Sequence, residues 1–240
     1  MILNAGFMQT LWWFPVLIFC SVTESFTQTR SSHSSSTTAQ VSLKILGNSQ
    51  KTSVFITKSN LLNYFRDTLA GSKTDASGHS ALLFPLLEPT FAEIRIGNRK
   101  SNLYLTPGDD LVIHVDLANS NFLFTGKGSE PNKYLSQSEA IRQKNIIYKG
   151  QYINELKTAL FINHLDTLAK AFGLFHSQYI KAHPLPKHVS NLLKANNALF
   201  IHSFAQNYAD VYFGTFEQRD KMPKRLKELT NHIYFDTTFL

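Results

Sequence analysis

The chain has 240 residues, 43% of them apolar and 17% charged, a composition typical of a globular protein and not of a disordered one. Its 24 lysines and arginines outnumber its 17 acidic residues, which gives a net charge of +7 and a pI near 9.4. The cations are scattered singly along the sequence, so a solvated basic surface is favoured over a patch that binds nucleic acid.

The N-terminal residues resemble an export signal. Residues 11–22 form an apolar run interrupted by Pro15, too short to cross about 30 Å of hydrocarbon. Small and hydroxyl residues follow, so we predict a signal peptide over residues 1–27, although no Lys or Arg precedes the run and the cleavage site stays open. The predicted location is therefore the periplasm or cell envelope, with no transmembrane span.

Cys20 is the only cysteine of the chain and lies inside that apolar run. A disulfide, a thiolate metal site or a dithiol redox couple needs more than one thiol, so none of these is expected in the folded part. A lipid anchor at Cys20 is the less favoured alternative, because Phe19 stands where a lipoprotein signal has Gly, Ala or Ser.

A Ser/Thr-rich tract over residues 28–38 predicts a flexible tether. After it, short runs with alternating apolar residues predict strands, and Gly47-Asn48 between the first two predicts a hairpin. Strands at this spacing, separated by turn residues, predict an antiparallel β-sandwich over residues 39–128. The predicted strands cover residues 41–45, 53–57, 80–87, 91–96, 103–105, 111–116 and 121–125.

The segment Pro107-Gly108-Asp109-Asp110 predicts a turn before the strand at residues 111–116. Asp109, Asp110 and Asp116 also raise the alternative of a calcium cluster. A whole strand separates Asp110 from Asp116, and EF-hand spacing is absent from the sequence. We therefore favour the turn interpretation.

The apolar period changes after residue 131. Three- and four-residue spacing predicts a helix from about residue 151 to 181, ended by Pro184-Leu185-Pro186, and a second one from residue 189 to about 214. Pro223 suits the first turn of a short third helix. Strands followed by a helical segment over residues 129–240 predict an α+β fold. The predicted core includes Leu43, Ile45, Phe55, Leu105, Ile113, Phe124, Leu156, Leu168, Phe172, Leu193 and Phe204.

We assign no catalytic, cofactor-binding or metal-ligating residue from the sequence. His164, His176, His183, His188 and His202 show no spacing that requires them to converge on zinc, so surface or capping positions are favoured. Ser and Thr are abundant, but no Gly-x-Ser-x-Gly or Ser-x-x-Lys motif stands beside a matching base. The aromatic stripes of the helices favour a helix–helix core over a ligand groove.

Several separated motifs stand in a fixed order: Leu-Tyr-Leu-x-Pro-Gly-Asp, a strand with Asp, Phe-x-Gly-x-Gly, and Asn-x-Tyr-Leu. This order resembles the N-terminal accessory region of envelope thiol:disulfide reductases of the TlpA/ResA-like family, over residues 39–236. Such proteins typically continue into a thioredoxin-fold domain with Trp-Cys-x-x-Cys, which this sequence lacks, so the resemblance transfers no catalytic residue. It rests on Leu103, Tyr104, Leu105, Pro107, Gly108, Asp109, Asp116, Phe124, Gly126, Gly128, Asn132, Tyr134 and Leu135.

The resemblance implies a non-catalytic, exported accessory module without a cofactor. Its expected partner is a thioredoxin-fold redox domain or another envelope protein, and not nucleic acid. The alternative is an independent envelope protein whose sandwich or helical groove binds a peptide, glycan or protein. A secreted hydrolase is the third and weaker hypothesis.

Overall fold

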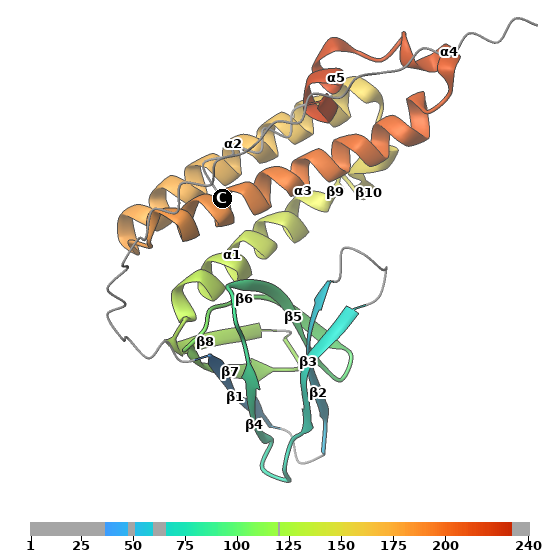
Figure 1. Ribbon diagram of the computed structural model, residues 1–240. Helices are drawn as coiled ribbons and strands as arrows, with labels where there is room; N and C mark the ends of the chain where they lie inside the picture. Colours follow the sequence, from blue (N-terminus) through green and yellow to red (C-terminus); the bar gives the residue numbers. More distant parts are fainter. Residues whose placement is uncertain (1–36, 48–50, 60–65, 120, 232–240) are drawn as a thin grey trace, which may run out of the picture. The chain divides into compact units, whose positions relative to one another are not determined.

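The computed structural model describes residues 37–47, 51–59, 66–119 and 121–231 (Figure 1). The predicted signal peptide, Cys20 and most of the predicted tether lie outside these residues. Residues Ser35–Leu240 belong to one unit. All the strands that form its two large sheets precede the helices, which confirms the predicted α+β fold.

Two four-stranded sheets face each other over a common apolar core. The core side chains alternate along every strand except β3, as the period-two pattern predicts. They include Val41, Leu43, Ile45, Ile56, Ile94, Leu105, Ile113 and Phe124. The strands are β1 (Thr38–Leu46), β2 (Ser53–Ser59), β3 (Arg66–Lys73), β4 (His79–Pro85), β5 (Thr90–Ile96), β6 (Arg99–Leu105), β7 (Asp110–Asp116) and β8 (Asn121–Lys127).

The first sheet has the order β4-β1-β7-β8, and the second has the order β3-β2-β5-β6. The hairpin predicted at Gly47-Asn48 is wrong, because β1 pairs with β4 and β7 whereas β2 pairs with β3 and β5. Turn residues mark where a chain reverses, but they do not choose the partner strand. The first sheet is also not wholly antiparallel, because β1 runs parallel to β7.

Phe55 was predicted in the core but is 44% exposed, while its neighbours Val54 and Ile56 are fully buried. Three apolar residues in a row leave the inward phase of a strand undecided. The Phe55 ring lies instead over Gly71 of β3, where a Cβ atom would come within 2.9 Å of the ring. The other predicted core residues are buried except Phe204, which is partly buried.

The helical segment begins with a helix that the sequence did not predict, α1 (Ser129–Ile146), directly after β8. The helix expected from about residue 151 is α2 (Thr158–Ala182), and the predicted proline break separates it from α3 (Lys187–Phe213). None of the helices in the part of the chain that the structure describes is long and apolar enough to cross a membrane. The remaining elements are β9 (Ile147–Tyr148), β10 (Gln151–Tyr152), η1 (Ile153–Glu155), α4 (Phe216–Arg219) and α5 (Lys224–Asn231).

Two clusters of buried side chains hold the helices. One lies among α2, α3, α5 and η1, with Phe161 stacked on Tyr208 at 3.9 Å between ring centroids. The other joins the helices to the second sheet, because Tyr104 of β6 belongs to the same buried cluster as Tyr134, Tyr179 and Leu193. Tyr104 thus points away from the core between the sheets, where its neighbours Leu103 and Leu105 lie.

Candidate functional site

Three residues that carry the family resemblance, Tyr104, Gly128 and Asn132, meet at the junction of β6 and α1. The amide oxygen of Asn132 accepts a hydrogen bond from the Tyr104 N–H at 2.9 Å. Its amide nitrogen donates to the Tyr104 carbonyl at 2.9 Å and to the Gly128 carbonyl at 2.7 Å. β6 is the outer strand of its sheet, so no further strand pairs with it on this side. The Asn132 side chain makes the hydrogen bonds to the Tyr104 backbone that such a strand would make.

Glycines at 126 and 128 allow the chain to turn from β8 into α1. Both have positive φ, and a Cβ at Gly126 would lie 2.3 Å from the Asp110 carbonyl oxygen. At Gly128 it would lie 2.6 Å from the Asp109 carboxylate. The Phe-x-Gly-x-Gly motif is therefore required by close packing at this junction.

Two aspartates of the calcium alternative, Asp109 and Asp116, serve turns, and the third, Asp110, is the first residue of β7. The Asp109 carboxylate accepts hydrogen bonds from the N–H and the hydroxyl of Thr106, both at 2.7 Å. The Asp116 carboxylate accepts hydrogen bonds from the side-chain amide and the backbone N–H of Asn119. These bonds hold the pKa of Asp116 below its usual value. Among the described residues, no three His, Cys, Asp or Glu side chains group as metal ligands.

A second set of polar side chains is buried among α1, α2 and α3. Arg142 Nη2 donates to Asn197 Oδ1 at 2.9 Å, and the Ser138 hydroxyl donates to the same oxygen. Arginine has only donors, so this contact fixes the orientation of the Asn197 amide. Its nitrogen then donates to the Tyr134 hydroxyl at 3.0 Å.

His176 of α2 continues this network. Its Nδ1 lies 3.1 Å from the Tyr134 hydroxyl, and its Nε2 lies 3.3 Å from the Ser190 hydroxyl. Because the Tyr134 hydroxyl accepts a hydrogen bond from Asn197, it can donate its own hydrogen bond to His176 Nδ1. That arrangement places the imidazole proton on Nε2, facing Ser190.

Burial sets the electrostatics of the network. It raises the pKa of Tyr134 to about 12, against the opposing effects of Asn197 and Arg142. Burial also lowers the pKa of His176, and the Lys194 ammonium adds to that effect. It lowers the pKa of Arg142, whose guanidinium lies 4.7 Å from the centre of the Phe200 ring. At neutral pH, Tyr134 and His176 are thus uncharged and Arg142 is a buried cation.

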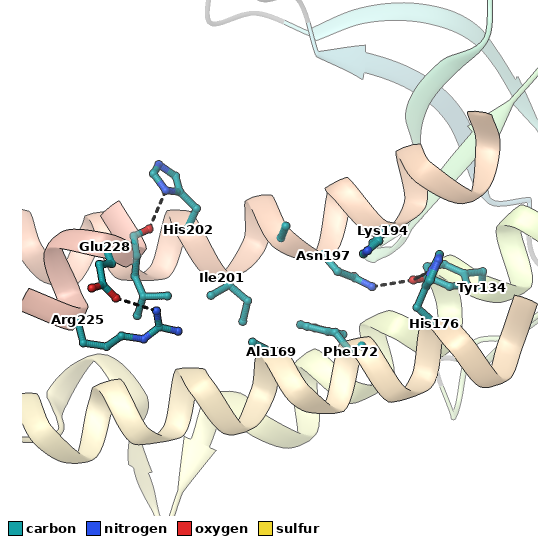
Figure 2. A pocket seen from close by; sticks show the side chains of 13 residues that line it. Tyr134, Ala169, Phe172, His176, Lys194, Asn197, Ile201, His202, Arg225 and Glu228 are labelled. Atoms are coloured by element: carbon teal, nitrogen blue, oxygen red, sulfur yellow. Dashed lines mark hydrogen bonds and ion pairs between the residues drawn. The ribbon is translucent and has the colours of Figure 1, made fainter. Parts of the chain in front are cut away.

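The network forms one end of a pocket of about 500 Å³ between α2, α3 and α5. Figure 2 shows Tyr134, His176 and Lys194 together at that end, and Arg225 with Glu228 at the other. Phe172, Ile201 and Ala169 line the middle. The pocket therefore has an apolar wall between two polar ends.

The two ends differ in charge. Arg225 Nη2 contacts Asp166 at 2.6 Å and Arg225 Nη1 contacts Glu228 at 3.1 Å, so its positive charge is offset twice. Lys194 makes no ion pair within the described residues. The end near Lys194 is accordingly the one with uncompensated positive charge.

The Ser190–His176 contact has the composition of a nucleophile and its base. Ser190 is only 9% exposed and does not line the pocket, while His176 does. A nucleophile must reach the substrate. We therefore interpret Ser190 as a residue that holds the His176 ring in place.

His176 is partly buried in the pocket, which differs from the surface or capping position predicted for it. Three other histidines fit simpler roles: His164 contacts the Asn145 carbonyl, His202 contacts the Leu229 carbonyl and His183 contacts Glu130. The sequence does not predict the polar network, and it raises a ligand groove along the aromatic stripes only as the less favoured alternative. The available signal was the four-residue spacing of Tyr134, Ser138 and Arg142, which places polar groups on the buried face of one helix.

A scan against protein-family models finds no match to the sequence, and a search of curated proteins finds none either. The resemblance to TlpA/ResA-like proteins therefore stays a prediction.

Proposed function

We propose that the chain is a non-catalytic, exported accessory module of the cell envelope. It would position or bind a thioredoxin-fold redox domain, as the resemblance to the N-terminal region of TlpA/ResA-like reductases implies. The signal-like residues 1–27 support export, and a single cysteine at Cys20 leaves residues 28–240 without a thiol for redox chemistry of their own.

One observation supports this proposal: residues from three of the four motifs behind the resemblance converge on the β6–α1 junction. Tyr104, Gly128 and Asn132 come from separate motifs and are joined there by hydrogen bonds with no solvent exposure at Asn132. Motifs used for joining two layers of structure suit a scaffold better than an active site.

The first test is the redox activity of the full chain. It should not accelerate the reduction of insulin by dithiothreitol, because no pair of thiols is present to shuttle electrons. Turnover above the rate with dithiothreitol alone would contradict the non-catalytic assignment.

The second test concerns the partner. A reading frame adjacent to the gene should encode a thioredoxin-fold protein with Cys-x-x-Cys, and the two purified proteins should co-elute in size-exclusion chromatography. Absence of such a frame, or separate elution at micromolar concentrations, would reject the accessory role. Thioredoxin from an unrelated source serves as the control for non-specific binding.

The pocket supports a second candidate function, an independent binding protein. Its volume of about 500 Å³ lies in the range of small-molecule sites, and polar groups converge on one end of an apolar wall. This candidate does not depend on a redox partner.

A further inference from the structure

We propose that the pocket between α2, α3 and α5 binds a small apolar molecule with a single carboxylate. The carboxylate would contact Lys194, and the hydrocarbon body would lie along Phe172, Ile201 and Leu229. This inference does not rest on the accessory function, because it uses none of the junction residues and needs no protein partner.

The charge at the Lys194 end selects an anion. Lys194 lines the pocket without an ion pair in the described parts of the chain. Behind the wall, Arg142 is 8% exposed and contacts one acidic group, Glu139, at 3.6 Å. Arg142 is screened from solvent but directs its Nη2 toward Asn197, which lines the pocket. A negative charge bound at this end would experience attraction from both cations.

The opposite end does not compete for that charge. Asp166 and Glu228 hold the Arg225 guanidinium, and His202 is engaged with the Leu229 carbonyl. With one unpaired ammonium in the lining, the pocket matches a single negative charge better than a polyanion. The distribution therefore fixes the orientation of the ligand as well as its class.

The middle of the pocket selects an apolar body. Ala169, Phe172, Ala198, Ile201 and Leu229 contribute side chains with no hydrogen-bonding group. Gly173 leaves additional space, because a Cβ atom there would meet nothing within 4 Å. A chain of about ten carbons is within the size that pockets of this volume accept.

Decanoate is the probe, and decanol is the uncharged comparison, both below their aggregation concentrations in isothermal titration calorimetry with the full chain. Decanoate should bind about tenfold more tightly than decanol, because a charge-assisted contact is added to the same apolar burial. Equal affinities, or no decanoate binding up to its aggregation limit, would overturn the proposal.

Two variant pairs locate the site. Lys194→Met should weaken decanoate about tenfold and leave decanol unchanged, whereas Lys194→Arg should retain the preference. Gly173→Leu should abolish binding of both probes by filling the pocket, while Gly173→Ala adds one methyl and should bind normally. The exposed Lys170, which does not line the pocket, gives the control Lys170→Met. Decanoate binding that Gly173→Leu and Lys194→Met leave unchanged would place it elsewhere.

These outcomes are separable from those of the accessory proposal. A chain that binds decanoate but no thioredoxin-fold protein supports the pocket alone. A chain that binds the redox partner but not decanoate retains the accessory function and rejects the carboxylate site.

Discussion

Asn132 of α1 completes the main-chain hydrogen bonding of Tyr104 in β6, with both contacts at 2.9 Å and no exposure of the Asn132 side chain to solvent. A side chain takes the place of a neighbouring strand along this short stretch. Asn132→Ala should lower the free energy of unfolding by about 2–4 kcal/mol, because it leaves several buried backbone groups without partners.

Urea denaturation monitored by circular dichroism measures this change. The matched control is Asn163→Ala on the exposed face of α2, which should cost less than about 1 kcal/mol. Similar losses in the two variants would contradict the role given to Asn132.

Gly126 and Gly150 separate the cost of a left-handed backbone from the cost of a steric clash. Both have φ of 82°, but a Cβ at Gly126 would lie 2.3 Å from the Asp110 carbonyl oxygen, whereas one at Gly150 meets nothing within 4 Å. Gly150→Ala should cost about 1–2 kcal/mol. Gly126→Ala should cost at least about 2 kcal/mol more, measured by urea denaturation, and equal losses would rule out the clash.

Removing the Asn197 side chain should destabilise the protein more than removing the Arg142 guanidinium. Asn197→Ala deprives Arg142, Ser138 and Tyr134 of a shared partner, leaves a buried cation poorly paired, and should cost about 3–5 kcal/mol. Arg142→Met removes the cation itself, keeps contact with the Phe200 ring, and should cost about 1 kcal/mol or less. Thermal melting ranks the two variants, and a larger loss for Arg142→Met would reverse this assignment.

His176 should make the protein less stable in mild acid. Its pKa in the folded state is lowered from the ordinary 6.5 by burial and by Lys194. Below pH 6.5 the unfolded chain therefore binds a proton more readily than the folded one, so the stabilisation present above this pH is lost as the pH falls through the lowered pKa. The groups facing the ring are Tyr134, Ser190 and Lys194.

The measurement is the free energy of unfolding between pH 7 and pH 5. His176→Gln should show a shallower decline than the wild type, because the titrating group is gone. His188→Gln, at the exposed start of α3, is the matched control. Identical slopes for wild type and His176→Gln would remove His176 as a source of the pH dependence.

The alternation of apolar and polar residues predicted much of the sandwich, because most strands have an apolar inward face and a more polar outward face. In β7, for example, Leu111, Ile113 and Val115 are all fully buried. The alternation missed β3, an outer strand whose sequence is mostly polar and includes Gly71. It also missed α1, because the buried face of that helix carries Ser138 and Arg142 among its apolar residues.

Local sequence patterns could predict neither the strand order of the sheets nor the pocket, and the reason is the same for both. The parallel pairing of β1 with β7 joins Leu43 to Ile113, and the buried network joins Ser138 to Asn197. Both depend on which distant segments pack together. Periodicity reports the environment of a residue but not the identity of its neighbour.

The cover that α1 lays over β6 has a consequence for shortened versions of the protein. A fragment ending at Gly128 would keep both sheets but present the Tyr104 ring and its unpaired peptide groups to solvent. An open strand of this kind recruits another copy of itself. Such a fragment would therefore fail first by self-association and precipitation, even if every strand formed correctly.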